Sequence, residues 1–277
     1  MGLWRNIAGY AGNMVELFLP RSCAVCGEKL VSGESFICTE CRTRFPYTYF
    51  SPERFNPMAE RFNAQIQRHL DAAAEAGTPV PWHEPYACCT ALYFYKGDYR
   101  RLSQALKYDA NLPLGRYLAQ ALGRHIAQSP LFGTVDAVVP VPLHWRRRLA
   151  RGYNQAGVIA EELSRSIGAV CRPDILVRSR HTGTQTRLDR AAKAANVNGA
   201  FSVRGDRLDF MQCAPAASVG TGPGLPRHIL LVDDVFTTGA TLSECHFALR
   251  SALVSKYGPE AGSSILISAA TLAFVGE

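Results

Sequence analysis

Residues 229–241 constrain the fold of this chain more than any other segment. They begin with the apolar run 229–232, continue with Asp233 and Asp234, and end in the small, hydroxyl-rich segment 237–241 (Thr-Thr-Gly-Ala-Thr). A short apolar run of this kind predicts a strand buried on both faces, which is typical of parallel sheets. Open parallel sheets bind ligands at the carboxyl ends of their strands, where these two carboxylates lie. The segment therefore predicts an α/β fold with a ligand site at this position.

Residues 237–241 have the composition of a phosphate-binding loop. Small side chains let backbone N–H groups approach a phosphate, the N-terminus of a following helix favours negative charge, and threonine hydroxyls can donate further hydrogen bonds. Two carboxylates beside such a loop would repel an anion unless they met hydroxyl groups or a metal. A sugar phosphate satisfies both conditions, with its phosphate in the loop and its ribose diol on Asp233 and Asp234. The alternative is an ordinary strand and turn, with threonines that cap a helix.

The rest of the chain alternates strand and helix patterns, as expected for a parallel sheet flanked by helices. Strand patterns cover residues 91–95, 135–139 and 264–273, with weaker ones at 174–177 and 200–203. Helix patterns cover residues 99–108, 114–128, 154–167 and 242–255, and an earlier one has apolar positions at Met58, Phe62, Ile66 and Leu70. The GxxxxGK[ST] nucleotide loop does not occur in the sequence, which argues against a P-loop NTPase.

Four of the nine cysteines form two closely spaced pairs near the N-terminus. Cys23 and Cys26 make the first pair, followed by Gly27, which allows a tight turn, and Cys38 and Cys41 make the second. Four thiolates at this spacing suit a tetrahedral zinc ion and leave no open coordination position, so we expect a structural metal that stabilises a segment with little core. A redox CxxC or a disulfide pair is the alternative, although an odd number of cysteines excludes a complete disulfide framework.

Length and composition set further bounds. The chain has 277 residues, is 47% hydrophobic and carries a formal charge of +7, which argues against disorder and favours a soluble protein with one medium-sized core and an appendage. Polar residues interrupt the apolar stretch 2–19, so its helical spacing predicts a docked amphipathic helix and not a signal peptide. We therefore expect a cytoplasmic protein in a reducing compartment, without membrane insertion.

The positive charge is confined to two segments. Residues 141–155 and residues 177–199 each carry +4, which leaves the remaining chain at −1. The first segment follows a strand and starts in the proline-containing turn 140–143, where backbone N–H groups and arginine forks could bind pyrophosphate. The second segment is poor in apolar residues and could close over a charged substrate as a lid. A solvated basic face or a nucleic-acid surface is the alternative for both.

Taken together, these features resemble the ComF family of competence-associated, phosphoribosyltransferase-like proteins. Residues 229–241 match the phosphoribosyl pyrophosphate (PRPP) motif of type I phosphoribosyltransferases, and the four cysteines, the turn 140–143 and the run 151–156 (Arg-Gly-Tyr-Asn-Gln-Ala) fit the same family. Further residues that fit it are Lys107, Arg180, Thr182, Gln185, Arg190, Asn196 and Phe201. The stretch 51–85 and the loop 214–226 depart from the family pattern.

The resemblance implies a type I phosphoribosyltransferase-like central parallel sheet flanked by helices, with a small N-terminal zinc-ribbon-like module. On this basis we expect an amphipathic helix at 1–20, a four-cysteine zinc module at 21–46, a linker with a helical insertion at 47–89, and a phosphoribosyltransferase-like domain at 90–277.

By the same resemblance, the protein would bind Mg²⁺–PRPP and transfer phosphoribosyl to an unknown nucleophilic acceptor, with release of pyrophosphate. The implied catalytic residues are Asp233, Asp234 and Arg151. The implied PRPP contacts are Asp233, Asp234, Val235, Thr237, Thr238, Gly239, Ala240, Thr241, Pro142 and Leu143. The implied lid and pyrophosphate residues are Arg180, Gln185 and Arg190, and the ligands of the structural zinc are Cys23, Cys26, Cys38 and Cys41.

Two other functions fit the same sequence. One is an accessory protein for DNA uptake, whose zinc module and basic segments meet single-stranded DNA or a helicase-like partner. The other is a PRPP sensor without catalysis. We expect no glutaminase activity, because the chain starts Met1-Gly2 and its first cysteine is an expected zinc ligand.

Overall fold

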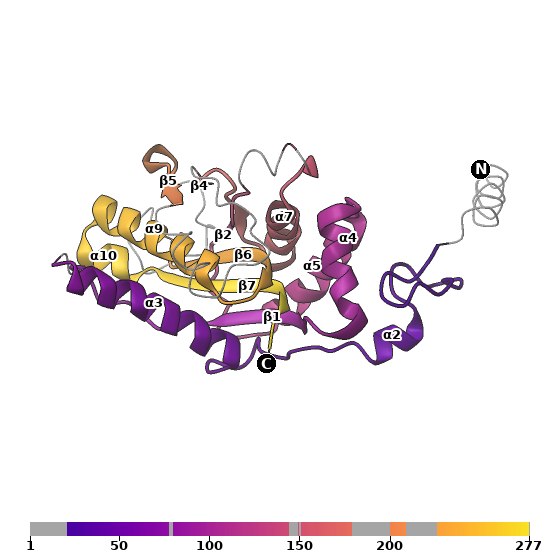
Figure 1. Cartoon of the computed structure of the whole chain (residues 1–277). Helices are drawn as coiled ribbons and strands as arrows, with labels where there is room; N and C mark the ends of the chain where they lie inside the picture. Colours follow the sequence, from indigo (N-terminus) through magenta and orange to yellow (C-terminus); the bar gives the residue numbers. More distant parts are fainter. Residues whose placement is uncertain are drawn as a thin grey trace.

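The computed structural model describes residues 21–77, 80–143, 149, 151–178, 200–208 and 226–276. In this part of the chain, parallel strands form a five-stranded sheet with helices on both faces (Figure 1). The strands, in their spatial order, are β1 (Cys89–Phe94), β7 (Leu266–Phe274), β6 (His228–Phe236), β2 (Ala137–Pro140) and β3 (Val170–Cys171). The parallel sheet predicted from the alternating strand and helix patterns is confirmed.

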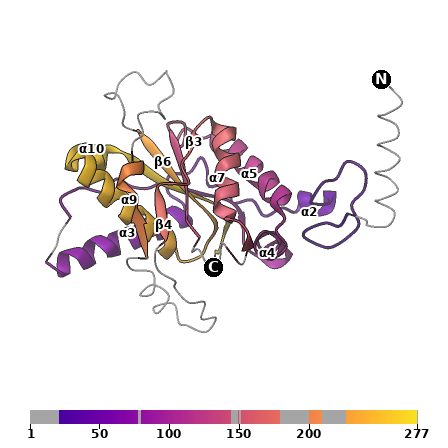
Figure 2. The same ribbon diagram turned by 90° about the horizontal axis from the view of Figure 1, so that it is seen from above.

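The helices divide between the two faces of the sheet because successive strand residues point to opposite sides. Among the residues that the structure describes, the four long helices are α3 (Pro57–Glu75), α5 (Leu112–Ala127), α7 (Gln155–Ile167) and α9 (Ala240–Tyr257). In β6, Ile229 and Leu231 pack on the side of α3 and α9, whereas Leu230 and Val232 pack on the side of α5 and α7. Seen from above, α3 and α9 lie across the sheet from α5 and α7 (Figure 2). The shorter helices are α2 (Thr39–Thr43), η1 (Gly97–Tyr99), α4 (Arg100–Tyr108), η2 (Gly205–Arg207) and α10 (Pro259–Ser264).

The order of the strands creates a crevice between β2 and β6. From β2 the chain passes through α7 to the edge strand β3, whereas from β6 it passes through α9 to β7, in the opposite direction. Such a reversal separates the loops that follow the two central strands, and open α/β sheets bind ligands there. Pro140 pairs with Val232, so the turn that follows β2 begins beside Asp233 and Asp234.

Three strand predictions differ from the structure. The weak patterns at 174–177 and 200–203 correspond to β4 (Leu176–Arg178) and β5 (Phe201–Val203), which pair antiparallel in a separate small sheet. The parallel sheet instead includes β3, whose two residues are too few to give a periodic pattern. β6 extends past the predicted run 229–232 to Phe236, because β7 pairs with it along its length.

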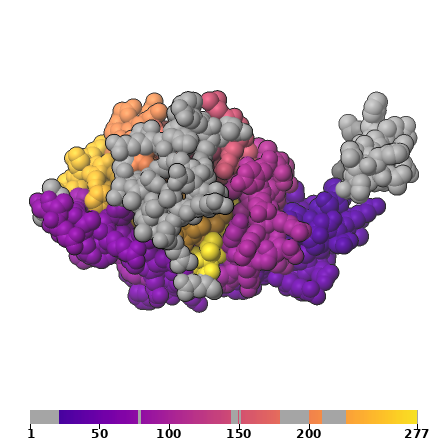
Figure 3. Space-filling view, viewed as in Figure 1, coloured from indigo at the N-terminus to yellow at the C-terminus, as the bar shows by residue number. Residues whose placement is uncertain are grey.

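The four-cysteine module lies at one end of the molecule, beside α4 and α5 (Figure 3). Tyr99 donates a hydrogen bond from its hydroxyl to the Cys41 carbonyl oxygen at 2.8 Å, and Arg101 Nη1 donates to the Val25 carbonyl oxygen at 2.9 Å. The Phe45 ring packs edge-on against Tyr99. The module is therefore docked on the elements that follow β1.

Residues 47–89 supply a helix to the core of the α/β domain. Pro57 starts α3, and the Asn56 side chain caps it by accepting hydrogen bonds from the backbone N–H groups of Met58 and Ala59. Met58 and Phe62 are fully buried against the sheet. The stretch that departs from the family pattern thus covers part of one sheet face.

Several sequence predictions lie outside the described residues. They are the amphipathic helix at 1–20, the lid residues Arg180, Gln185 and Arg190, and most of the loop 214–226. Among the helices that are described, none has the length and apolar character needed to cross a membrane.

A buried ion pair fixes the chain that leads into β1. Glu84 is 6% exposed and receives hydrogen bonds from Nε and Nη2 of Arg250, which is 1% exposed. His246 Nε2 lies 3.1 Å from the same carboxylate, and Trp82 Nε1 donates to it. Burial alone would raise the pKa of Glu84, but His246 and Arg250 together lower it to about 2.

Replacing Glu84 by glutamine is expected to lower the free energy of unfolding by about 3–5 kcal/mol, because the buried Arg250 would keep its charge without a counter-ion. The matched control is Asp98→Asn, which breaks the exposed Asp98–Arg101 pair and is expected to cost less than about 1 kcal/mol.

The pH dependence follows from the depressed pKa. The native pKa of Glu84 lies below its unfolded value, so the stabilisation is present above about pH 4.3 and is lost as the pH falls towards 2. Urea denaturation at a series of pH values should show this loss in the wild type and not in Glu84→Gln. Equal stabilities of the two proteins at pH 7 would contradict the prediction.

Candidate functional site

Asp233 and Asp234 stand at the carboxyl end of β6. Lys107 Nζ, at the end of α4, lies 3.0 Å from Asp234 Oδ2, and the backbone N–H of Asp234 donates to Asp233 Oδ1 at 2.8 Å. Desolvation, and next the adjacent Asp234 carboxylate, raise the pKa of Asp233 to about 7, although Lys107 and Arg178 oppose the shift. Asp233 therefore holds its proton to a higher pH than an ordinary aspartate, which sequence reasoning did not predict.

The loop 237–239 joins the acidic pair to α9 and depends on its glycine. Gly239 has φ +83°, and a Cβ placed there would lie 2.7 Å from Cζ of Phe236. An L side chain is thus excluded both by backbone conformation and by lack of space. Thr238 Oγ1 accepts a hydrogen bond from the Ala240 backbone N–H at 3.4 Å, at the start of α9. The loop is thus a tight turn that connects the end of β6 to the N-terminus of α9.

A cavity of about 170 Å³ opens between the loops that follow β2 and β6. The predicted site residues that line it are Pro142, Leu143, Arg151, Asp233, Asp234 and Thr241. It is also lined by Lys107, Val141, Asn154, Gln155, Ala156 and Arg178. The crevice expected from the strand order therefore brings the acidic pair of β6 together with the turn after β2 and with Arg151.

Hydrogen bonds hold the run 151–156, which carries Arg151, against the end of α4, which carries Lys107. Arg151 Nη1 donates to Gln155 Oε1 at 3.3 Å, and the Arg151 guanidinium lies 5.8 Å from the centre of the Tyr108 ring. The Tyr153 hydroxyl donates to the carbonyl oxygen of Leu106, which precedes Lys107. These contacts tie the run 151–156 to the end of α4, so Arg151 and Lys107 reach the same cavity.

A second cavity of about 590 Å³ adjoins the first. The two share Pro142, Leu143, Asn154 and Arg178 in their walls. The larger one extends along α7 to β4, and its charged lining residues are Glu161, Asp174, Arg178 and Arg204. The site thus has room for a group beyond the space next to the carboxylates.

The other predicted site residues are placed differently. Val235, Thr237, Thr238, Gly239 and Ala240 form the end of β6, the turn and the first residue of α9, and they do not line the smaller cavity. The sequence run that contains Asn154 and Gln155 indicated their importance but not their place in the cavity wall. For Arg178, the only signal was its position in a basic segment.

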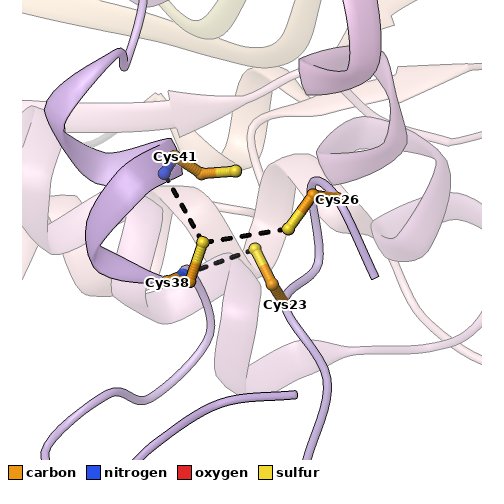
Figure 4. Close-up of side chains that lie close together, drawn as sticks. All are labelled: Cys23, Cys26, Cys38 and Cys41. Carbon is orange, nitrogen blue, oxygen red and sulfur yellow. Dashed lines mark hydrogen bonds between the residues drawn. The ribbon is translucent and has the colours of Figure 1, made fainter. Parts of the chain in front are cut away.

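The four cysteines of the N-terminal module converge on one point (Figure 4). Their sulfur atoms all lie within 4.8 Å of one another, and the Cys26 and Cys38 sulfurs are 3.8 Å apart. Four sulfurs placed tetrahedrally at the usual Zn–S distance of about 2.3 Å would also be separated by about 3.8 Å. The cluster is therefore compatible with a structural zinc ion, and the four cysteines predicted as ligands lie together as one group.

The surroundings of the four cysteines favour a thiolate at Cys23 and disfavour one at Cys41. Burial raises the pKa of the Cys23 thiol, but hydrogen bonds from the backbone N–H groups of Cys26, Cys38 and Val25 together lower it to about 7. Burial and the neighbouring thiols raise the pKa of Cys41. A bound cation would offset this repulsion, since metal coordination deprotonates thiols.

Several known proteins are similar to this chain in sequence. No family model matches it. It is 27% identical to the DNA utilization protein YhgH of Escherichia coli K12 over 82% of this chain and 90% of that protein. It is 32% identical to competence protein F of Haemophilus influenzae over 54% of this chain and 60% of that protein, and 30% identical to competence protein ComFC of Bacillus subtilis over 49% and 43%.

Among solved structures, the chain is similar to adenine phosphoribosyltransferase from Leishmania donovani, with 12% identity, a TM-score of 0.29, and coverage of 71% of this chain and 89% of that one. A second similar structure, the enzyme from Leishmania tarentolae, has a TM-score of 0.25 at 11% identity and covers 64% and 74%. The matches to YhgH extend over most of this chain and of that protein, and the four cysteines form the cluster that the resemblance implied. The chain is therefore similar, over most of its length, to the YhgH proteins, and over about half of its length to the competence proteins F and ComFC.

Proposed function

We propose that this protein is a phosphoribosyltransferase that binds Mg²⁺–PRPP in the crevice between β2 and β6. The observation that carries the proposal is the 170 Å³ cavity, in whose wall Asp233, Asp234, Arg151 and Thr241 meet. Carboxylates suit ribose hydroxyls, whereas a guanidinium and a helix N-terminus suit phosphate oxygens. PRPP carries both ribose hydroxyls and phosphate oxygens in one molecule.

Each part of the site has a role in this proposal. The loop 237–241 and the N-terminus of α9 hold the 5′-phosphate through backbone N–H groups and threonine hydroxyls. Asp233 and Asp234 accept hydrogen bonds from the two ribose hydroxyls. Pro142 and Leu143 present the turn after β2 to the pyrophosphate, beside Arg151.

In the reaction, the bond between ribose C1 and the pyrophosphate oxygen breaks, and the electron pair leaves with pyrophosphate. A lone pair of the acceptor then forms the new bond to C1, and the proton that the acceptor loses passes to solvent water. Positive charge on the ribose ring is stabilised by Asp233 and Asp234, while Arg151 neutralises the leaving group. Mg²⁺ bound with PRPP would add further neutralisation of the pyrophosphate. The proposed lid residues are Arg180, Gln185 and Arg190.

The zinc ion is proposed to be structural, since four cysteines fill a tetrahedral coordination sphere. The names of the relatives refer to competence and DNA utilization. We propose that this protein also serves the uptake or use of DNA, and that it does so in the cytoplasm. In this proposal, the acceptor of the phosphoribosyl group links the reaction to that process.

The experiment is pyrophosphate release by the purified full chain with PRPP, Mg²⁺ and a panel of nucleobases and amines. We expect release with at least one acceptor, and none with Asp234→Asn. PRPP binding without release from the whole panel would contradict catalysis and favour a sensor. Salt-dependent binding of single-stranded DNA, with no binding of PRPP, would instead favour an accessory role in DNA handling.

A further inference from the structure

We propose that Arg61 and Gln65, both on α3, are positioning residues that orient the backbone of the phosphate-binding loop. The inference rests on the proposed function, because it concerns the loop that would hold the 5′-phosphate of PRPP. It assigns a role to the stretch 51–85, where the chain departs from the family pattern.

Two side chains of α3 bind successive carbonyl groups of the loop. Arg61 Nη1 donates to the Thr237 carbonyl oxygen at 3.0 Å, and Gln65 Nε2 donates to the Thr238 carbonyl oxygen at 3.1 Å. Residues four apart lie on the same face of a helix, so the spacing of Arg61 and Gln65 allows both to reach one short loop.

Arg61 also connects the loop to the end of the sheet. Its Nη1 donates to the Val275 carbonyl oxygen at 2.8 Å, and its guanidinium lies 5.1 Å from the centre of the Phe274 ring at the end of β7. The Val275 backbone N–H in turn donates to the Phe236 carbonyl oxygen, directly before the loop. One guanidinium therefore bridges the loop and the strand beside it.

The helix that carries these side chains is a rigid support. Met58, Phe62 and Ile66 on α3 are buried against the sheet, and the Phe62 ring packs edge-on against Phe236. Phe236 is also the residue that fills the space beside Gly239. The helix, the strand end and the turn thus form one packed unit.

The consequence for the loop follows from peptide geometry. In a planar trans peptide, the carbonyl group and the following N–H point in opposite directions. Because the carbonyl groups of Thr237 and Thr238 point to α3, the N–H groups of Thr238 and Gly239 point away from it. Two successive N–H groups turned to the same side form a concavity for an anion. α3 therefore orients the donors that a phosphate needs.

The test uses ribose 5-phosphate as the probe, because it contains the phosphate that the loop would hold and lacks pyrophosphate. Calorimetric titration of the full chain is expected to show an affinity about 10-fold weaker in Arg61→Ala and in Gln65→Ala, since each variant loses a hydrogen bond that fixes the loop. Arg61→Lys keeps one cationic donor and should recover part of the affinity. The control is Gln67→Ala, whose side chain donates to Asp71 on the same helix and should leave the affinity unchanged.

Kinetics separate positioning from a general loss of structure. With PRPP as substrate, the variants should raise KM and leave kcat nearly unchanged, because the 5′-phosphate is bound equally in the ground state and the transition state. Gln65→Ala, with the smaller change in contacts, keeps the test valid if Arg61→Ala does not fold.

The outcomes distinguish this inference from the proposed function. If the wild type binds neither ribose 5-phosphate nor PRPP, the proposed function fails. If the wild type binds and folded Arg61→Ala and Gln65→Ala bind equally well, the positioning role is overturned while the proposed function stands. A fall in kcat and melting temperature together, with KM unchanged, would also overturn it.

Discussion

Replacing Asp234 by asparagine is expected to lower kcat for pyrophosphate release by about 100- to 1000-fold, the effect typical of removing one preorganised electrostatic group from a transition state. The variant keeps the shape of the side chain and removes the charge that would stabilise the positive ribose ring. In the wild type, Lys107 Nζ lies 3.0 Å from Asp234 Oδ2, so the variant also leaves Lys107 without this counter-charge in the cavity. Steady-state kinetics with saturating PRPP measure the change.

Asp233→Asn provides a stability control for the same prediction. The native pKa of Asp233, about 7, lies above the unfolded value, so burying its charged form costs stability progressively as the pH rises from about 4 through 7. The asparagine variant lacks this cost and should be at least as stable as the wild type at pH 8. Loss of activity without loss of stability is the expected result. Full activity in both variants would contradict the assigned roles.

If the four cysteines bind zinc as proposed, removal of the metal is expected to unfold residues 21–46. Structural zinc in small cysteine modules contributes about 10–16 kcal/mol of apparent binding free energy, far more than the few buried side chains of this module can supply. Cys38→Ser should therefore lose the metal, and its backbone amides in this range should exchange hydrogen within seconds. Metal analysis and hydrogen exchange followed by mass spectrometry measure both effects.

Cys171→Ser is the matched control for metal loss. Cys171 lies on β3 and does not belong to the group of four cysteines. Burial raises the pKa of its thiol to about 11, which disfavours the thiolate. This variant should retain one zinc ion per chain and the exchange protection of the wild type. Unchanged protection of residues 21–46 in Cys38→Ser would show that the module does not depend on metal.

Metal loss should also reach the neighbouring elements. The Cys41 and Val25 carbonyl groups accept hydrogen bonds from Tyr99 and Arg101, which lie at the start of α4, the helix that carries Lys107. Unfolding of the module removes these contacts, so faster exchange is expected in α4 as well as in residues 21–46. The sheet face covered by α3 and α9, whose buried cluster contains no residue of the module, should remain protected.

Local sequence patterns predicted much of the candidate site because its main residues lie next to one another in the chain. The apolar run before Asp233 indicated a strand end, and the small residues after it indicated the turn into α9. The spacing of the four cysteines likewise predicted the cluster that the structure contains. In each case the proposed ligating groups and the backbone that presents them belong to one short segment.

The remaining features depend on strand order and packing. The turn at Pro142 meets Asp233 because β2 and β6 are neighbours in the sheet, which periodicity does not reveal. Lys107 reaches Asp234 from another helix, and Arg61 reaches the loop from a helix far earlier in the chain. The helical pattern of α3 indicated its apolar face, whereas the polar residues at its edge carried no signal of a partner. β3 is too short to be predicted from its own sequence.

Calorimetric titration of the full chain with PRPP in the presence of Mg²⁺ tests whether PRPP binds between β2 and β6. We expect saturable binding of one PRPP molecule per chain, which is lost when Asp233 and Asp234 are both replaced by asparagine in a protein that remains folded. Absence of binding by the wild type, or equal binding by the double variant, would contradict binding at this site.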